Sequence, residues 1–135
     1  MKQSPTKRRI ALTAATVFYV AAGILHFVKP GAYLKIVPPF VPAHLAMVYI
    51  SGACEILGGL GLLVPAARRL AAWGLIALLV AVFPANIYML TNPLEAGAAS
   101  VPPILLWGRL ALQPLLIWWI MWCYRPPSSQ RTTAE

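Results

Sequence analysis

Four long runs of hydrophobic residues, separated by short stretches rich in proline, glycine or charge, divide the chain. They cover residues 10–28, 44–64, 70–90 and 103–124. A helix needs about 20 residues to cross a hydrocarbon core of about 30 Å, and each run has close to that length. The runs are hydrophobic on all sides instead of along one stripe, which indicates helices surrounded by lipid and protein. The pattern therefore predicts an all-α fold: an antiparallel bundle of four transmembrane helices, forming a single membrane domain over residues 1–135.

The connections between the runs differ in character. Pro65 and two arginines make a tight turn between the second and third runs, so these helices are expected to be antiparallel neighbours. The connection over residues 29–43 contains four prolines and mixes apolar with basic residues. It predicts a short amphipathic turn followed by extended chain at the membrane surface. Two interpretations of this segment stay open, a lid and a packed connection.

Composition agrees with a membrane protein. The 135 residues are 60% hydrophobic and 10% charged, and the mean hydropathy is +0.74. These values lie outside the range of ordinary soluble domains. The first run also resembles a secretory signal, because basic residues precede it and small residues follow at 21–23. It continues past Gly23, however, which favours a spanning helix.

The basic residues predict an orientation, since lysine and arginine are enriched in cytoplasmic loops. With the amino terminus in the cytoplasm, only Lys29 and Lys35 lie outside. Both termini are therefore expected to be cytoplasmic. The net charge of +8 is divided among loops and not gathered into one stripe with aromatic residues, so no nucleic-acid partner is expected. In the orientation predicted above, the eight basic residues on the cytoplasmic side are Lys2, Lys7, Arg8, Arg9, Arg68, Arg69, Arg125 and Arg131.

Glu55 lies near the middle of the second hydrophobic run. Its neighbours three and four positions away are small (Ser51, Gly52, Gly58 and Gly59), so its face is expected to pack tightly against another helix. An ionised carboxyl at mid-bilayer costs about 2.5 to 3.5 kcal/mol on insertion scales and needs a partner or water. Arg109 is the basic residue that lies well inside a run. The depths of the two residues differ by about five positions, roughly 7 to 8 Å, so we expect them to pair directly or through one water.

Other polar side chains fall in the same outer half of the bilayer as Arg109. Pro84 and Pro114, in the third and fourth runs, each leave a backbone carbonyl without its helical donor. Together these features predict one outward-opening polar pocket. Two interpretations stay open: a ligand or proton site, and a structural network that holds the helices together. Glu55 and Arg109 are the proton or ion-pair candidates, and the ligand-binding candidates are His26, Ser51, Asn86 and Gln113.

Metal, haem and thiol chemistry find little support. No group of histidines and carboxylates has the spacing of a metal site. His26 and His44 are a weak pair of haem ligands, because His44 lies at a loop boundary. Cys54 and Cys123 lie at different depths and form no CxxC motif, so both are interpreted as small apolar fillers. No metal or haem cofactor is predicted.

Two stretches, GILHFVKPGAYLKIVPPFVP and SGACEILGGLGLLVPAARRLAAWGLIALLVAVFPANIYM, carry a resemblance over about residues 23–89. Glycine, histidine and phenylalanine, then VPP-x-x-P, SG-x-x-E and FPAN, follow in the order found in the DoxX-like membrane proteins of bacteria. This resemblance implies a multi-pass four-helix protein of the inner (plasma) membrane, usually a small redox-associated subunit linked to quinone-coupled sulfur oxidation or oxidative stress. The chain lacks the cysteine pair of a dithiol enzyme. By motif, the positions that carry over are His26, Pro38, Pro39, Glu55, Pro84 and Asn86.

The leading hypothesis is a redox-associated accessory protein whose pocket binds a quinone-like or lipid-like molecule. In it, Glu55 accepts or passes a proton, Arg109 holds its charge state, and His26 and Asn86 bind the head group. One alternative is an intramembrane isomerase-like enzyme acting on a lipophilic substrate, although Glu55 is the only acid inside a run. Another is an assembly partner with no ligand. Expected partners are the lipid bilayer, other membrane or redox proteins and a second copy of the chain.

Overall fold

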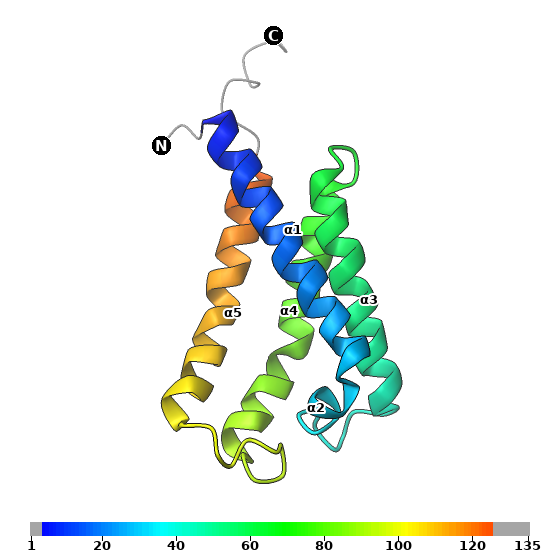
Figure 1. The fold of residues 1–135 in the computed structure, drawn as a ribbon, viewed down its shortest axis with the longest axis vertical. Coiled ribbons are helices and arrows are strands. Elements are labelled where there is room, and N and C mark those ends of the chain that lie inside the picture. Colours follow the sequence, from blue (N-terminus) through cyan, green and yellow to red (C-terminus); the bar gives the residue numbers. More distant parts are fainter. Residues whose placement is uncertain (1–3, 126–135) are drawn as a thin grey trace.

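The computed structural model describes residues 4–125, which form helices and no strands. Four of the helices are long and apolar enough to cross a membrane, and they lie side by side (Figure 1). The all-helical prediction with four spanning segments is therefore confirmed. The elements in chain order are α1 (Pro5–Val28), the short α2 (Pro30–Leu34), α3 (His44–Leu63), α4 (Arg68–Thr91) and α5 (Pro103–Tyr124).

The start of α1 differs from the prediction, because the helix begins at Pro5 and not near residue 10. The Ser4 hydroxyl accepts a hydrogen bond from the backbone N–H of Lys7 at 3.2 Å, which caps the helix. Proline at the first helical position loses no hydrogen bond there. The helix thus runs through the basic residues that precede the hydrophobic run. The other three long helices begin and end within two residues of the expected boundaries.

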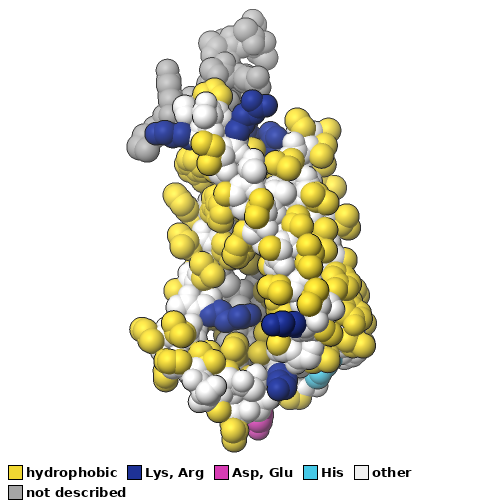
Figure 2. All heavy atoms as spheres, in the orientation of Figure 1, with side chains coloured by type: hydrophobic (Ala, Val, Ile, Leu, Met, Phe, Trp, Pro, Cys, Tyr) yellow, Lys and Arg dark blue, Asp and Glu magenta, His cyan; other side chains and the backbone are white. Residues whose placement is uncertain are grey.

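The most extensive contact between helices is that of α1 with α3, followed by α3 with α4 and then α4 with α5. One end of the molecule, here called the arginine end, holds the start of α1, the turn between α3 and α4, and the end of α5. There Arg8 donates from Nε to the carbonyl oxygen of Cys123 at 2.9 Å, and Arg68 donates to that of Leu62 at 2.7 Å. Figure 2 shows lysine and arginine side chains at this upper end.

The opposite end, here called the loop end, holds α2 and the segment 92–102. Within this end the side chain of Lys35 lies against Gly97, whose φ of +67° is in the left-handed region. The expected short turn in the first connection is α2, and it is followed by turns and bends up to His44. Two of the eight basic residues predicted to be cytoplasmic, Lys2 and Arg131, are not among the residues that the structure describes.

Helices α1 and α3 share the closest contact in the bundle. A Cβ atom added at Gly23 would lie 2.6 Å from the carbonyl oxygen of Gly52, and one added at Gly52 would lie 2.7 Å from Cβ of His26. About two turns along each helix, the hydroxyl of Thr16 donates to the carbonyl oxygen of Gly59 at 2.8 Å. Glycine therefore lets the two backbones approach, as in other small-residue contacts between membrane helices.

The small residues around Glu55 face three different surroundings, which are helix α1, helix α4 and the interior of the bundle. Gly52 and Gly59 face α1, whereas a Cβ at Gly58 would lie 2.6 Å from Leu75 of α4. Ser51 lines a cavity described below. The tight face predicted from these small residues is thus present, and it joins α3 to both α1 and α4.

The buried hydrophobic core lies in the half of the bundle nearer the arginine end, where all four long helices contribute. Toward the loop end α1 and α5 diverge (Figure 1), and residues of both helices line the cavity described below. The bundle is consequently packed in one half and hollow in the other. The core residues are Leu12, Ala15, Tyr19, Leu62, Ala72, Leu75, Leu79, Leu116, Ile120 and Cys123.

Candidate functional site

A cavity of about 510 Å³ lies between the helices toward the loop end. Small-molecule sites in proteins occupy about 300 to 1,000 Å³, so the space is large enough for a ligand. All four long helices and the segment after α2 contribute to its walls, which are mostly apolar. The structure brings together on these walls all six side chains selected from the sequence: His26, Ser51, Glu55, Asn86, Arg109 and Gln113.

Glu55 of α3 meets His26 of α1. The Nδ1 atom of His26 lies 3.2 Å from Oε2 of Glu55, which is within ion-pair distance when the histidine is protonated. The same nitrogen lies 2.9 Å from the carbonyl oxygen of Ala22. A carbonyl only accepts, so Nδ1 carries a proton and directs it at Ala22. Oε2 of Glu55 is therefore at ion-pair distance but, buried as it is, has no hydrogen-bond partner of its own.

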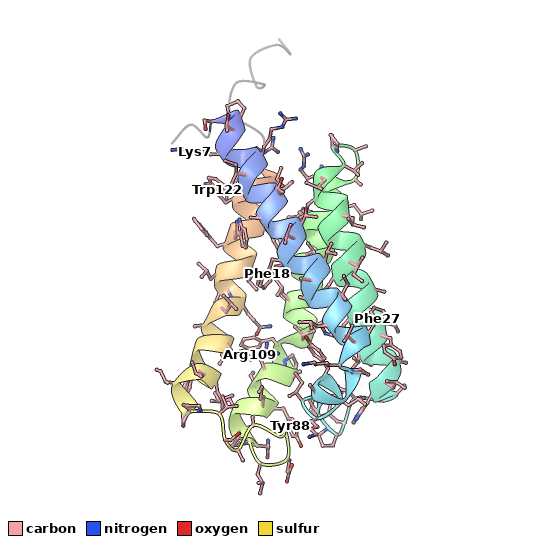
Figure 3. The ribbon with its side chains drawn as sticks, viewed as in Figure 1. Lys7, Phe18, Phe27, Tyr88, Arg109 and Trp122 are labelled. Atoms are coloured by element: carbon pink, nitrogen blue, oxygen red, sulfur yellow. The ribbon has the colours of Figure 1, made fainter. Side chains whose placement is uncertain are left out.

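Arg109 of α5 is bonded to Asn86 of α4. Its Nε donates to Oδ1 of Asn86 at 2.7 Å, and Figure 3 shows the side chain reaching out from α5. The direct contact expected between Arg109 and Glu55 is not formed within residues 4–125, where Glu55 has His26 as its partner. The reason is the order of the helices: α3 packs on α1 and α4, whereas α5 packs on α4 and lies across the cavity. Pairing through a water stays a prediction.

Three buried polar atoms on the cavity walls have no hydrogen-bond partner among the described residues: the hydroxyl of Tyr19, Oε2 of Glu55 and Oε1 of Gln113. Tyr19 is 2% exposed and Gln113 is 5% exposed. Buried polar groups in folded proteins are nearly always hydrogen-bonded, because an unpaired one costs about 1 to 3 kcal/mol. Three such atoms on residues that line one cavity indicate that water or a ligand supplies the missing partners.

Two tyrosines of the site were missed by sequence reasoning. Tyr19 lies seven residues before His26, two helical turns along the same face of α1. This spacing could have identified Tyr19 as a residue of the site. Tyr33 of α2 stacks on His26 with ring centroids 3.8 Å apart. Its placement depends on how α2 folds back over the end of α1, which hydropathy does not reveal. Burial first, and the nearby charge of Glu55 second, raise the pKa of Tyr33 against the opposing effect of Arg109. Its hydroxyl is thus protonated at neutral pH.

The chemistry available in the cavity is hydrogen bonding, charge and proton exchange. The free cysteines contribute nothing to its walls: Cys123 is buried as expected of a filler, whereas Cys54 is exposed. In residues 4–125 no three histidine, cysteine or acidic side chains gather closely enough to hold a metal ion. An apolar space with a few convergent polar groups is the usual form of a site for a small, largely hydrophobic molecule.

Comparison with known proteins identifies one family. The family model described as a domain of unknown function, DUF8561, matches residues 14–124. This range includes most of α1, all of the other three long helices and most of the chain, so the chain belongs to this family. No curated protein and no solved structure matches it. The resemblance to the DoxX-like proteins stays a prediction.

Proposed function

We propose that this member of the DUF8561 family is a membrane protein that holds a lipophilic molecule with a polar head, quinone-like or lipid-like, in the cavity between its helices. The observation that carries the proposal is the set of three partnerless polar atoms on the walls of one mostly apolar space. The apolar walls suit the body of such a ligand, and the polar atoms suit its head. Following the resemblance to DoxX-like proteins, its role is that of a redox-associated accessory subunit.

The proposed topology is antiparallel, with both termini cytoplasmic and the cavity toward the outer face of the inner (plasma) membrane. At the arginine end lie Arg8, Arg68 and their basic neighbours, whereas Lys29 and Lys35 flank α2 at the loop end. The enrichment of basic residues on the cytoplasmic side supports this orientation. A site near the outer face suits exchange of protons with the space outside.

Access to the cavity is proposed from the side, out of the lipid. Phe18 of α1 is 40% exposed and Leu112 of α5 is 41% exposed, and both line the cavity. Arg109 is also exposed where it bridges from α5 to Asn86. A ligand dissolved in the bilayer would pass between the diverging helices α1 and α5, with its head moving toward the polar wall.

Roles for the polar residues follow from their positions. His26 and Glu55 form a pair that can accept or pass a proton, and Arg109 with Asn86 offers donors to the head group. An isomerase-like enzyme would use a second acid, and Glu55 is the acid that lines the cavity among the described residues. Binding therefore has stronger support than catalysis.

A thermal-unfolding assay tests the proposal with neighbouring alanines as a matched pair. Ala22 lines the cavity, whereas Ala21 is exposed and lies outside it. Purified protein is heated with and without a panel of quinones and lipids. A ligand at 100 times its dissociation constant stabilises the folded state by about 2.7 kcal/mol, so at least one panel member is expected to raise the unfolding temperature. The increase is expected to persist in Ala21→Phe and to disappear in Ala22→Phe, where the new ring occupies the cavity.

Two outcomes of the same assay would contradict the proposal. If no panel member stabilises the parent protein, the cavity is not a site for these molecules. If Ala21→Phe and Ala22→Phe respond equally to a panel member, that molecule acts from the lipid surface and not from the cavity. Ala85 lines the opposite wall on α4, so Ala85→Phe replaces Ala22→Phe if the latter does not fold.

A further inference from the structure

The partnerless atoms restrict the kind of head group that fits. The most informative is Oε1 of Gln113, because the orientation of this amide is fixed. Its Nε2 donates to the carbonyl oxygen of Leu79 at 3.1 Å, and a carbonyl cannot donate in return. Oε1 is therefore the atom left over, buried on the cavity wall with no donor directed at it.

The other two atoms, Oε2 of Glu55 and the hydroxyl oxygen of Tyr19, differ in whether they can donate a hydrogen bond. A carboxyl oxygen such as Oε2 of Glu55 keeps acceptor capacity whether the group is ionised or protonated. The hydroxyl of Tyr19 can donate and accept. All three lack partners, so the tyrosine hydroxyl does not reach either acceptor. The wall thus offers at least two acceptors that need a donor, and one donor that needs an acceptor.

We propose, resting on the function proposed above, that the cavity selects a lipophilic alcohol or phenol, whose hydroxyl donates to Oε1 of Gln113. A hydroxyl both donates and accepts, so its oxygen remains available to the hydroxyl of Tyr19. A ketone, ether or carboxylate head only accepts and leaves Oε1 of Gln113 unpaired in a buried site. Among quinone-like molecules, this favours the reduced dihydroxy form over the oxidised form.

Two probes that differ in one hydrogen-bond donor test the inference: 4-octylphenol and its methyl ether, 4-octylanisole. Binding of each to the purified full-length chain is measured by titration. Because leaving a buried acceptor unpaired is costly, the phenol is expected to bind at least about ten-fold more tightly. In Gln113→Leu this preference is expected to fall to about two-fold or less. It is expected to persist in the control Leu115→Met, because Leu115 is an exposed residue of α5 that does not line the cavity.

The outcomes separate the inference from the proposed function. Equal binding of the two probes, tighter binding of the ether, or a preference that survives in Gln113→Leu overturns the inference and leaves the cavity a ligand site. Binding of a panel quinone without binding of either probe does the same. If neither probe nor any panel member binds, the cavity holds water alone and both proposals fail. Should Gln113→Leu not fold, the comparison of the two probes on the parent chain still decides.

Discussion

Gly52→Leu is expected to prevent α1 and α3 from packing together, and so to abolish accumulation of folded protein in the membrane. A Cβ at this position would already lie 2.7 Å from Cβ of His26 and 2.9 Å from the carbonyl oxygen of Gly23. Leucine adds three further carbons to a space already bounded by the carbonyl oxygen of Gly23 and by side-chain atoms of His26 and Phe27. Overpacking of a core commonly costs 1 to 3 kcal/mol, and a wedge between two backbones should exceed about 3 kcal/mol.

Gly74→Leu is the matched control, since it makes the same change at a helical glycine of α4 with open space around it. A Cβ added at Gly74 would have no neighbour within 4 Å. Membrane fractions are compared by immunoblot, and surviving protein by gel filtration in detergent. Normal amounts of monodisperse Gly52→Leu protein would show that α1 and α3 do not meet through these glycines.

His26→Phe is expected to lower the free energy of unfolding by about 2 kcal/mol. The phenyl ring keeps the stacking on Tyr33 but removes the ion-pair partner of Glu55, whose oxygen lies 3.2 Å from the histidine. Breaking a buried pair by removing one member is costly because the other stays buried and uncompensated. The side chain of Glu55 is 18% exposed, so water in the cavity offsets part of the loss.

A double variant distinguishes this cause from a simple loss of packing. In His26→Phe with Glu55→Leu no uncompensated carboxyl remains, so most of the lost stability is expected to return. Reversible unfolding in detergent is followed by circular dichroism, with His44→Phe at the start of α3 as the control outside the cavity. A double variant no more stable than His26→Phe would argue that the histidine contributes by packing and not through Glu55.

Hydropathy was sufficient to predict the four spanning helices because each run is long, apolar on all sides and bounded by charge or proline. It missed the first turn of α1, since capping by Ser4 extends the helix into residues that are not hydrophobic. The short α2 was expected only as an amphipathic turn. Its role in covering the cavity with Tyr33 depends on tertiary packing.

The polar residues of the site could be collected from the sequence, but their partners could not. Depth along each helix places Glu55, Arg109 and His26 in overlapping layers of the bilayer, and depth says nothing about which helices are neighbours. The close contact of Gly23 with Gly52 makes α1 the neighbour of α3, which brings His26 and not Arg109 to the acid. Knowledge of that one glycine contact would have corrected the expected pairing.

Tyr19→Phe separates a ligand site from a structural network, because it removes a hydroxyl that has no partner in the protein and leaves the buried ring in place. The measurement is the free energy of unfolding of this variant in the absence of any ligand. If the polar wall is kept for a ligand, the variant should be at least as stable as the parent chain, since an unpaired buried group costs stability. A loss of more than about 1 kcal/mol would mean that the hydroxyl is bonded within the folded protein, and the proposed site would then be a structural network.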